Sequence, residues 1–241
     1  MAHSFSDADH LPKRRSTPAD PEGLPRQRRG TTPQMHGRYP DYDVLADAAH
    51  WDPVTRELVM ARAGEVPPVR FFTAAEARCA RTFCDVVLAQ DREPRIPVME
   101  MVDNKLHEGR LDGFRYADMP DDRETWRLVL RGLDEAAGPG GLAAAAEDRR
   151  RAVVERFSRA QLSGGAWTAV NVSRAWSVVM RAVLAEFYSH PWAWNEIGFG
   201  GPAYPRGYMR LQSGPAGRDP HEAIEAFGLD PVRDVARRGL E

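Results

Sequence analysis

The segment from Phe187 to Leu211 constrains the fold most strongly, because it combines large aromatic side chains with residues that interrupt regular structure. Its aromatic residues are Phe187, Tyr188, Trp192, Trp194, Phe199, Tyr204 and Tyr208, and they are interspersed with three prolines and four glycines. Prolines inside a helix or a strand remove backbone donors. The pattern therefore predicts an irregular loop. If the loop is extended around the tryptophans, Trp192 and Trp194 point to opposite sides, and one of them can face outward. Rings in such a loop either pack against the protein or lie exposed for a partner.

Upstream of this segment, apolar residues recur at the three- and four-residue spacing of helices, and no alternating run is long enough to indicate a strand. Capping signals mark two helix starts: Asp52 precedes Pro53, and Thr73 is followed by Glu76. Residues 143–161 are rich in Ala and Arg, which predicts one continuous helix on the outside of the fold. We therefore predict an all-α fold, an irregular arrangement of about six to seven helices.

The composition changes at both ends of the chain. Residues 1–37 are rich in Pro, Arg, Asp, Ser and Thr without any periodicity, which predicts a disordered tail. We expect one helical domain over residues 38–211. The remaining residues, 212–241, predict a tail with short peripheral helices, because their apolar residues are few.

Charge and cysteine content exclude several classes of function. Of the 241 residues, 33 are Lys or Arg and 35 are Asp or Glu, and a net charge of −2 gives no electrostatic case for binding nucleic acid or an anionic membrane. No apolar run approaches the ~20 residues that span a bilayer. The two cysteines, Cys79 and Cys84, fall short of a zinc site, and on one helix they cannot readily form a disulfide. We interpret both as small apolar residues.

Several short motifs occur in a characteristic order along the chain. They are Phe71–Glu76, Arg95–Pro97, Gly113–Asp118, Phe187-Tyr188, His190-Pro191, Trp194, Gly198–Gly201 and Pro205–Tyr208. In this order they resemble the gluconate 2-dehydrogenase subunit 3 family over roughly residues 38–211. The resemblance implies a small, non-catalytic bacterial subunit without a cofactor of its own. It also implies a partner, an FAD-containing dehydrogenase of the glucose–methanol–choline type, often accompanied by a multihaem cytochrome c subunit.

Many members of that family carry a twin-arginine export signal. Here Arg14-Arg15 is followed by polar and proline residues instead of an apolar segment, and a signal requires that segment. We therefore expect the chain to stay in the cytoplasm unless an exported partner carries it to the periplasm.

The residues themselves offer only weak candidates for catalysis. His190 and Glu196 lie among the aromatic rings, where they would act as an acid–base pair; the alternative is that His190 bonds a backbone carbonyl and packs between rings. The glycines of 198–201 neither follow a strand nor open a helix, so we expect a tight turn instead of a phosphate loop. The sequence also lacks the GxGxxG, CxxCH and GxSxG motifs of dinucleotide, haem and hydrolase sites.

An acidic and basic cluster lies in residues 112–123. Acidic oxygens at short spacing suit Ca²⁺, but the spacing departs from the EF-hand pattern, so we expect a salt-bridged or solvated loop and no metal site. Its charged and aromatic members are Asp112, Arg115, Tyr116, Asp118, Asp121, Asp122 and Arg123.

The sequence thus predicts an accessory subunit that stabilises or matures a flavin-dependent sugar or alcohol dehydrogenase. Large rings in a rigid loop lose little entropy on binding and make good anchors. Two alternatives remain: a small enzyme that uses His190 and Glu196 in an aromatic pocket, and a purely structural helical protein. The expected partner-binding residues are Tyr188, His190, Trp192, Trp194, Phe199, Tyr204 and Tyr208.

Overall fold

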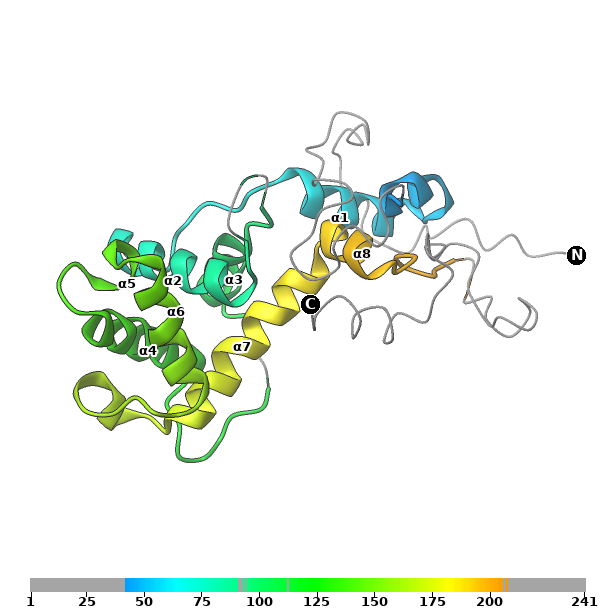
Figure 1. The fold of residues 1–241 in the computed structure, drawn as a ribbon. Helices are drawn as coiled ribbons and strands as arrows, with labels where there is room; N and C mark the ends of the chain where they lie inside the picture. The colour runs from blue at the N-terminus through cyan, green and yellow to red at the C-terminus, as the bar shows by residue number, and fades with distance from the viewer. Residues whose placement is uncertain (1–41, 91–92, 94, 112, 206, 208–241) are drawn as a thin grey trace, which may run out of the picture. The chain divides into compact units, whose positions relative to one another are not determined.

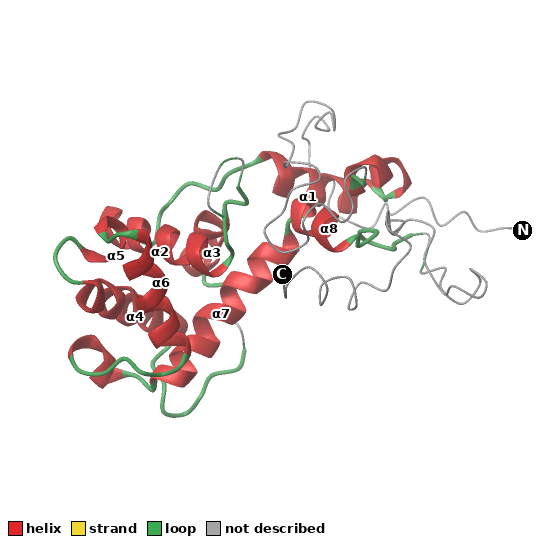
Figure 2. Cartoon of the chain, in the orientation of Figure 1, coloured by secondary structure: helices red, strands yellow, loops and turns green. Residues whose placement is uncertain are grey.

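The computed structural model describes residues 42–90, 93, 95–111, 113–205 and 207, and all regular secondary structure in these ranges is helical (Figures 1 and 2). The predicted all-α fold is therefore confirmed. The described residues divide into two compact units, residues 66–189 and residues 42–65 with 190–207. The domain expected over residues 38–211 thus comprises two units. The tails predicted for residues 1–37 and 212–241 lie outside the described residues.

The larger unit is an irregular helical bundle. It contains α2 (Ala74–Val87), α3 (Val98–Glu108), α4 (Asp122–Ala137), α5 (Gly141–Ala144), α6 (Glu147–Ser158), the 3-10 helix η3 (Gly165–Ala169) and α7 (Val172–Ser189). The wide apolar face of α2 predicts a central helix, and α2 does contact α3, α4, α5 and α6. The capping box predicted at its start is present, since Thr73 and Glu76 each bond the other's backbone N–H.

Aromatic rings fill the centre of this bundle. Phe157 lies 5.2 Å from Trp176 and 4.9 Å from Trp167, and Phe83 meets Trp126 and Trp176 edge to face. Trp167 comes from η3, which the periodicity did not predict. Its indole occupies space above Gly132 of α4, where an added Cβ would lie 2.4 Å from the ring, and the indole Nε1–H donates to the Gly132 carbonyl at 3.2 Å. Glycine in the middle of α4 therefore allows this packing.

The single helix predicted over residues 143–161 is wrong. The backbone is extended at Ala145 and Ala146, which separates α5 from α6. Tertiary hydrogen bonds stabilise this break: the Arg150 guanidinium donates to the carbonyls of Leu142 and Ala143, and Asp134 accepts from the Leu142 N–H. These bonds outweigh the helical propensity of the alanines. Val153, Val154 and Phe157 of α6 are buried, so this face of α6 belongs to the core.

A buried carboxylate fixes the chain just before α2. Asp103 of α3 is completely buried and accepts hydrogen bonds from the backbone N–H groups of Arg70, Phe71 and Phe72 at 2.6, 3.0 and 2.7 Å. Three donors replace the water that the carboxylate loses on burial, so its charge is accommodated inside the fold. Asp103 thereby sets the position at which Phe72 enters the core beside Trp126.

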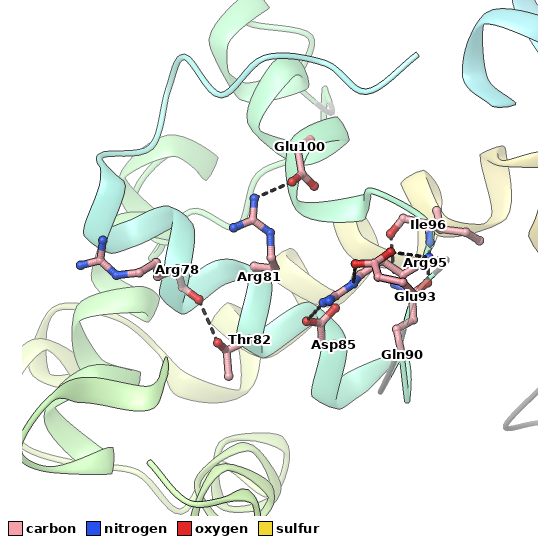
Figure 3. A network of polar contacts seen from close by, with 9 residues as sticks. All are labelled: Arg78, Arg81, Thr82, Asp85, Gln90, Glu93, Arg95, Ile96 and Glu100. Atoms are coloured by element: carbon pink, nitrogen blue, oxygen red, sulfur yellow. Dashed lines mark hydrogen bonds and ion pairs between the residues drawn. The ribbon is translucent and has the colours of Figure 1, made fainter. Parts of the chain in front are cut away.

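The connection between α2 and α3 is closed by polar side chains (Figure 3). The Gln90 side chain bonds both backbone groups of Ile96, and Arg95 forms ion pairs with Asp85 and Glu93. Burial is the main reason that the pKa of Asp85 rises to about 6, even though Arg95 opposes the rise. The Arg95-Ile96-Pro97 motif therefore has a structural role, because it holds this connection and leads into α3.

The smaller unit is built from both ends of the described chain. It contains the 3-10 helix η2 (Val44–His50), α1 (Pro53–Gly64) and α8 (Pro191–Ile197), and each of the three contacts the other two. Asp52 caps α1 as its sequence predicts, accepting from the N–H groups of Val54 and Thr55.

The loop predicted from Phe187 onward is wrong in its first part. The helix α7 continues to Ser189, and α8 follows directly. Pro191 occupies the first turn of α8, where a helix needs no N–H donor from it. Pro191, which argues against a helix in the sequence, therefore lies at the start of one.

Candidate interaction surface

The tryptophans of α8 belong to the protein's own interior. Trp194 is 6% exposed and packs with residues of η2 and α1, and its ring meets the half-buried Phe199 edge to face at 5.7 Å. Trp192 is 5% exposed and lies edge to face with His190 at 5.0 Å. The expectation that one indole faces outward is therefore wrong, because both are buried. The buried cluster around Trp194 comprises Val44, Leu45, Ala48, Trp51, Val59, Met60 and Ala63.

His190 caps α8. Its Nδ1 accepts a hydrogen bond from the Trp192 backbone N–H at 3.2 Å, so a neutral imidazole carries its proton on Nε2. The side chain is 1% exposed, and burial lowers its pKa to about 3, assisted by the charge of Arg62 and opposed by a hydrogen bond to the Arg62 backbone. His190 is therefore neutral at physiological pH and closed to solvent, which matches the backbone-bonded alternative that the sequence left open.

Glu196 is also buried, near the end of α8. The charge that acts on the pKa of His190 is that of Arg62. The acid–base pair therefore stays a prediction, and the burial of its imidazole does not favour it.

The glycine run continues the packing of this unit. At Gly201, where φ is +72°, an added Cβ would lie 2.9 Å from Val44 and 3.0 Å from the Trp51 ring. The missing side chain of Gly201 thus lets the chain pass close to Val44 of η2 and to Trp51, which follows η2. The turn in this run lies at Gly198, which ends α8 in the left-handed conformation, and Gly201 lies in an irregular stretch beside the Trp51 ring.

Two other residues that the sequence predicts to bind a partner face solvent. On α7, Tyr188 is 48% exposed, and Leu184, one turn earlier, is exposed beside it. In the smaller unit, Tyr204 is 53% exposed and Ile197 at the end of α8 is exposed as well. Tyr208 lies outside the described residues. The predicted partner-binding residues that the structure describes therefore include a buried group, His190, Trp192 and Trp194, and an exposed group, Tyr188 and Tyr204.

Comparison with known proteins supplies the family. A family model described as gluconate 2-dehydrogenase subunit 3 matches residues 74–201. The chain belongs to this family. No curated protein and no solved structure matches the chain. The match confirms the resemblance carried by the motifs, and it extends from the start of α2 to Gly201.

In this subunit 3 family member, the charged loop before α4 is held by ion-pair, aromatic and hydrogen-bond contacts. Arg174 of α7 forms an ion pair with Asp118, and its guanidinium lies 4.9 Å from the centre of the Tyr116 ring. Asp121 caps α4 by accepting from the Glu124 N–H at 2.9 Å, and Arg123 donates to the carbonyls of Leu106 and His107. The loop is therefore salt-bridged, as expected. In the ranges that the structure describes, no group of three His, Cys, Asp or Glu side chains is placed to hold a metal.

The cysteines of this family member lie on α2. Both are unpaired and buried, and burial raises the pKa of each thiol far above its ordinary value. Thiols in this state are poor nucleophiles and metal ligands, so the apolar interpretation fits their surroundings. Among the described helices, none is both long and apolar enough to cross a membrane.

Proposed function

We propose that this chain is a non-catalytic accessory subunit that binds an FAD-dependent dehydrogenase of the glucose–methanol–choline type and stabilises it or assists its maturation. The partner would hold the FAD and oxidise a sugar or an alcohol. The observation that carries the proposal is the family match over residues 74–201, since the family is defined as a subunit of gluconate 2-dehydrogenase.

The exposed apolar side chains of α7 support a binding role. Leu184 and Tyr188 lie one turn apart on a long, well-packed helix, so they present a rigid apolar strip to solvent. A rigid tyrosine binds with little loss of side-chain entropy, which makes it a suitable anchor. Ile197 and Tyr204 offer a similar pair of exposed side chains in the smaller unit.

The buried tryptophans would contribute indirectly. Trp194 packs α8 against η2 and α1, and Trp192 is buried beside His190 at the start of α8. This differs from the role expected from the sequence, in which the indoles themselves were anchors. The proposal therefore assigns partner contact to the exposed residues and assigns stability to the indoles.

Co-expression tests the proposal. A flavin-dependent dehydrogenase from the same genome, chosen by its GxGxxG motif, is produced with and without this chain, and FAD content and dehydrogenase activity are measured. We expect the two chains to purify together and the yield of FAD-loaded dehydrogenase to rise. If neither a complex nor a change in FAD-loaded yield is found, the accessory role is contradicted.

A further inference from the structure

The smaller unit is held together by contacts between two segments that lie far apart in the sequence. Its buried cluster joins Trp194 of α8 to residues of η2 and α1, and these three helices lie side by side in Figure 1. The Asn195 side chain accepts from the backbone N–H of Val44 at 2.8 Å. Residues 42–65 therefore lack part of their core unless residues 190–207 pack on them.

The chain passes between the two units at two non-helical places. Residues 65–70 are not helical, and all of them are exposed except the half-buried Pro67. The second place is His190, whose backbone is extended between α7 and α8. Because both connections are non-helical, the smaller unit can come apart without the breaking of a helix in the larger unit.

The larger unit has a core of its own. Phe157 lies 4.9 Å from Trp167 and 5.2 Å from Trp176, and all three rings come from residues 66–189. Both cysteines of α2 are buried in the same unit. A part of a protein that has its own core can stay folded while another part opens as a cooperative unit.

A buried imidazole lies where the two segments of the smaller unit meet. His190 caps α8 and also bonds the backbone of Arg62 in α1. Burial lowers its pKa to about 3, assisted by the Arg62 charge, and the ordinary value returns when the segments separate. The other ionisable side chains on the neighbouring described elements are Asp43, Asp47 and His50 around η2, Asp52, Arg56, Glu57 and Glu65 around α1, Glu186 and Tyr188 at the end of α7, and Glu196 of α8.

We propose that the smaller unit is an acid-sensitive conformational switch: residues 190–207 separate from residues 42–65 in one cooperative step while residues 66–189 stay folded, and protonation of His190 favours the separated form. Separation lets the imidazole reach water and take up a proton that its buried position excludes, so acid stabilises the open form. The open form exposes the apolar side chains around Trp194. This behaviour does not depend on the accessory role proposed above.

Hydrogen exchange of the full chain, followed by mass spectrometry of its peptides, tests the proposal. After correction for intrinsic exchange rates, we expect the amides of α1 and α8 to exchange at least about 10-fold faster than those of α2 and α4. Between about pH 7.5 and about pH 5.5, the opening equilibrium of α1 and α8 should rise about tenfold, as the pKa values of 6.5 and about 3 require. In His190→Asn, which keeps an acceptor for the cap, this rise should disappear.

Thiol labelling at constant pH gives a second readout that does not need the His190 variant to fold. Val59→Cys places a thiol of similar size in the buried cluster of the smaller unit. We expect a maleimide to label the introduced thiol at least about 10-fold faster than the native Cys79 and Cys84, which report on the larger unit.

Two results would overturn the proposal. Equal protection of both units, with equal labelling of the introduced and native thiols, would show that the chain opens only as a whole. Separate opening whose equilibrium does not change with pH, or changes equally in His190→Asn, would overturn the acid-sensitive switch at His190.

Discussion

The Asn195 side chain accepts a hydrogen bond from the backbone N–H of Val44 at 2.8 Å, across 151 positions of the sequence. In a second long-range bond, the Tyr42 hydroxyl donates to the Phe199 carbonyl at 2.9 Å. Both bonds join the start of the described chain to the aromatic segment. The segment is therefore an integral part of the fold, because it completes a unit that residues 42–65 begin.

Removing a core indole should destabilise the chain strongly. Trp194→Ala leaves a cavity between α8 and its neighbours, and we expect it to lower the unfolding free energy by about 3–5 kcal/mol. Tyr204→Ala removes an exposed ring and should change that free energy by less than about 0.5 kcal/mol. Urea unfolding of each variant measures the difference. Equal stabilities for the two variants would argue against the assignment of Trp194 to the core.

The buried Asp103, which binds the backbone just before α2, gives another stability prediction. Asp103→Ala leaves the backbone N–H groups of Arg70, Phe71 and Phe72 without their acceptor, and a buried donor left unpaired costs about 1–3 kcal/mol. We expect a loss of about 3 kcal/mol or more in urea unfolding, since several donors are affected. The exposed Asp148→Ala on α6 serves as a control and should unfold like the unaltered chain. An unchanged unfolding free energy for Asp103→Ala would mean that other contacts hold this segment in place.

The motifs predict the helical class, the caps of α1 and α2, and the family, because each depends on residues close together in sequence. The break between α5 and α6 was not predictable from propensity, since Arg150 and Asp134 impose it from elsewhere in the fold. The same is true of Trp167, whose place depends on a glycine in α4. Pro191 argues against a helix in the sequence, because the pattern does not show that it stands at the first turn of α8, where a proline is tolerated. Composition cannot distinguish an exposed aromatic residue from a buried one, which is why the sequence led us to expect one outward-facing indole in α8 although both are buried.

The buried imidazole should make stability depend on pH. The pKa of His190 falls from 6.5 to about 3 on folding, so between these values the unfolded chain binds more protons than the folded chain. This contribution to stability is present above pH 6.5 and is lost as the pH falls toward 3. His190→Asn keeps a side-chain acceptor for the cap and cannot titrate in this range. Its unfolding free energy should therefore decline less on acidification.

The comparison between the unaltered chain and His190→Asn at each pH isolates the histidine. Asp85, whose pKa is raised to about 6 in the folded state, acts in the opposite sense, favouring the folded state as the pH falls through that range. Asp85 is present in both proteins, so its effect cancels in the difference. Parallel pH profiles for the two proteins would contradict a neutral, buried His190.

We propose that the subunit contacts its dehydrogenase through exposed side chains, while the indoles of α8 stabilise the fold. The most direct measurement is the affinity of the Leu184→Ala/Tyr188→Ala double variant for the purified dehydrogenase, together with its melting temperature. We expect the variant to melt within a few degrees of the unaltered chain and to bind at least about 30-fold more weakly. Unchanged affinity with unchanged melting would contradict the claim, because α7 would then present no contact that the partner uses.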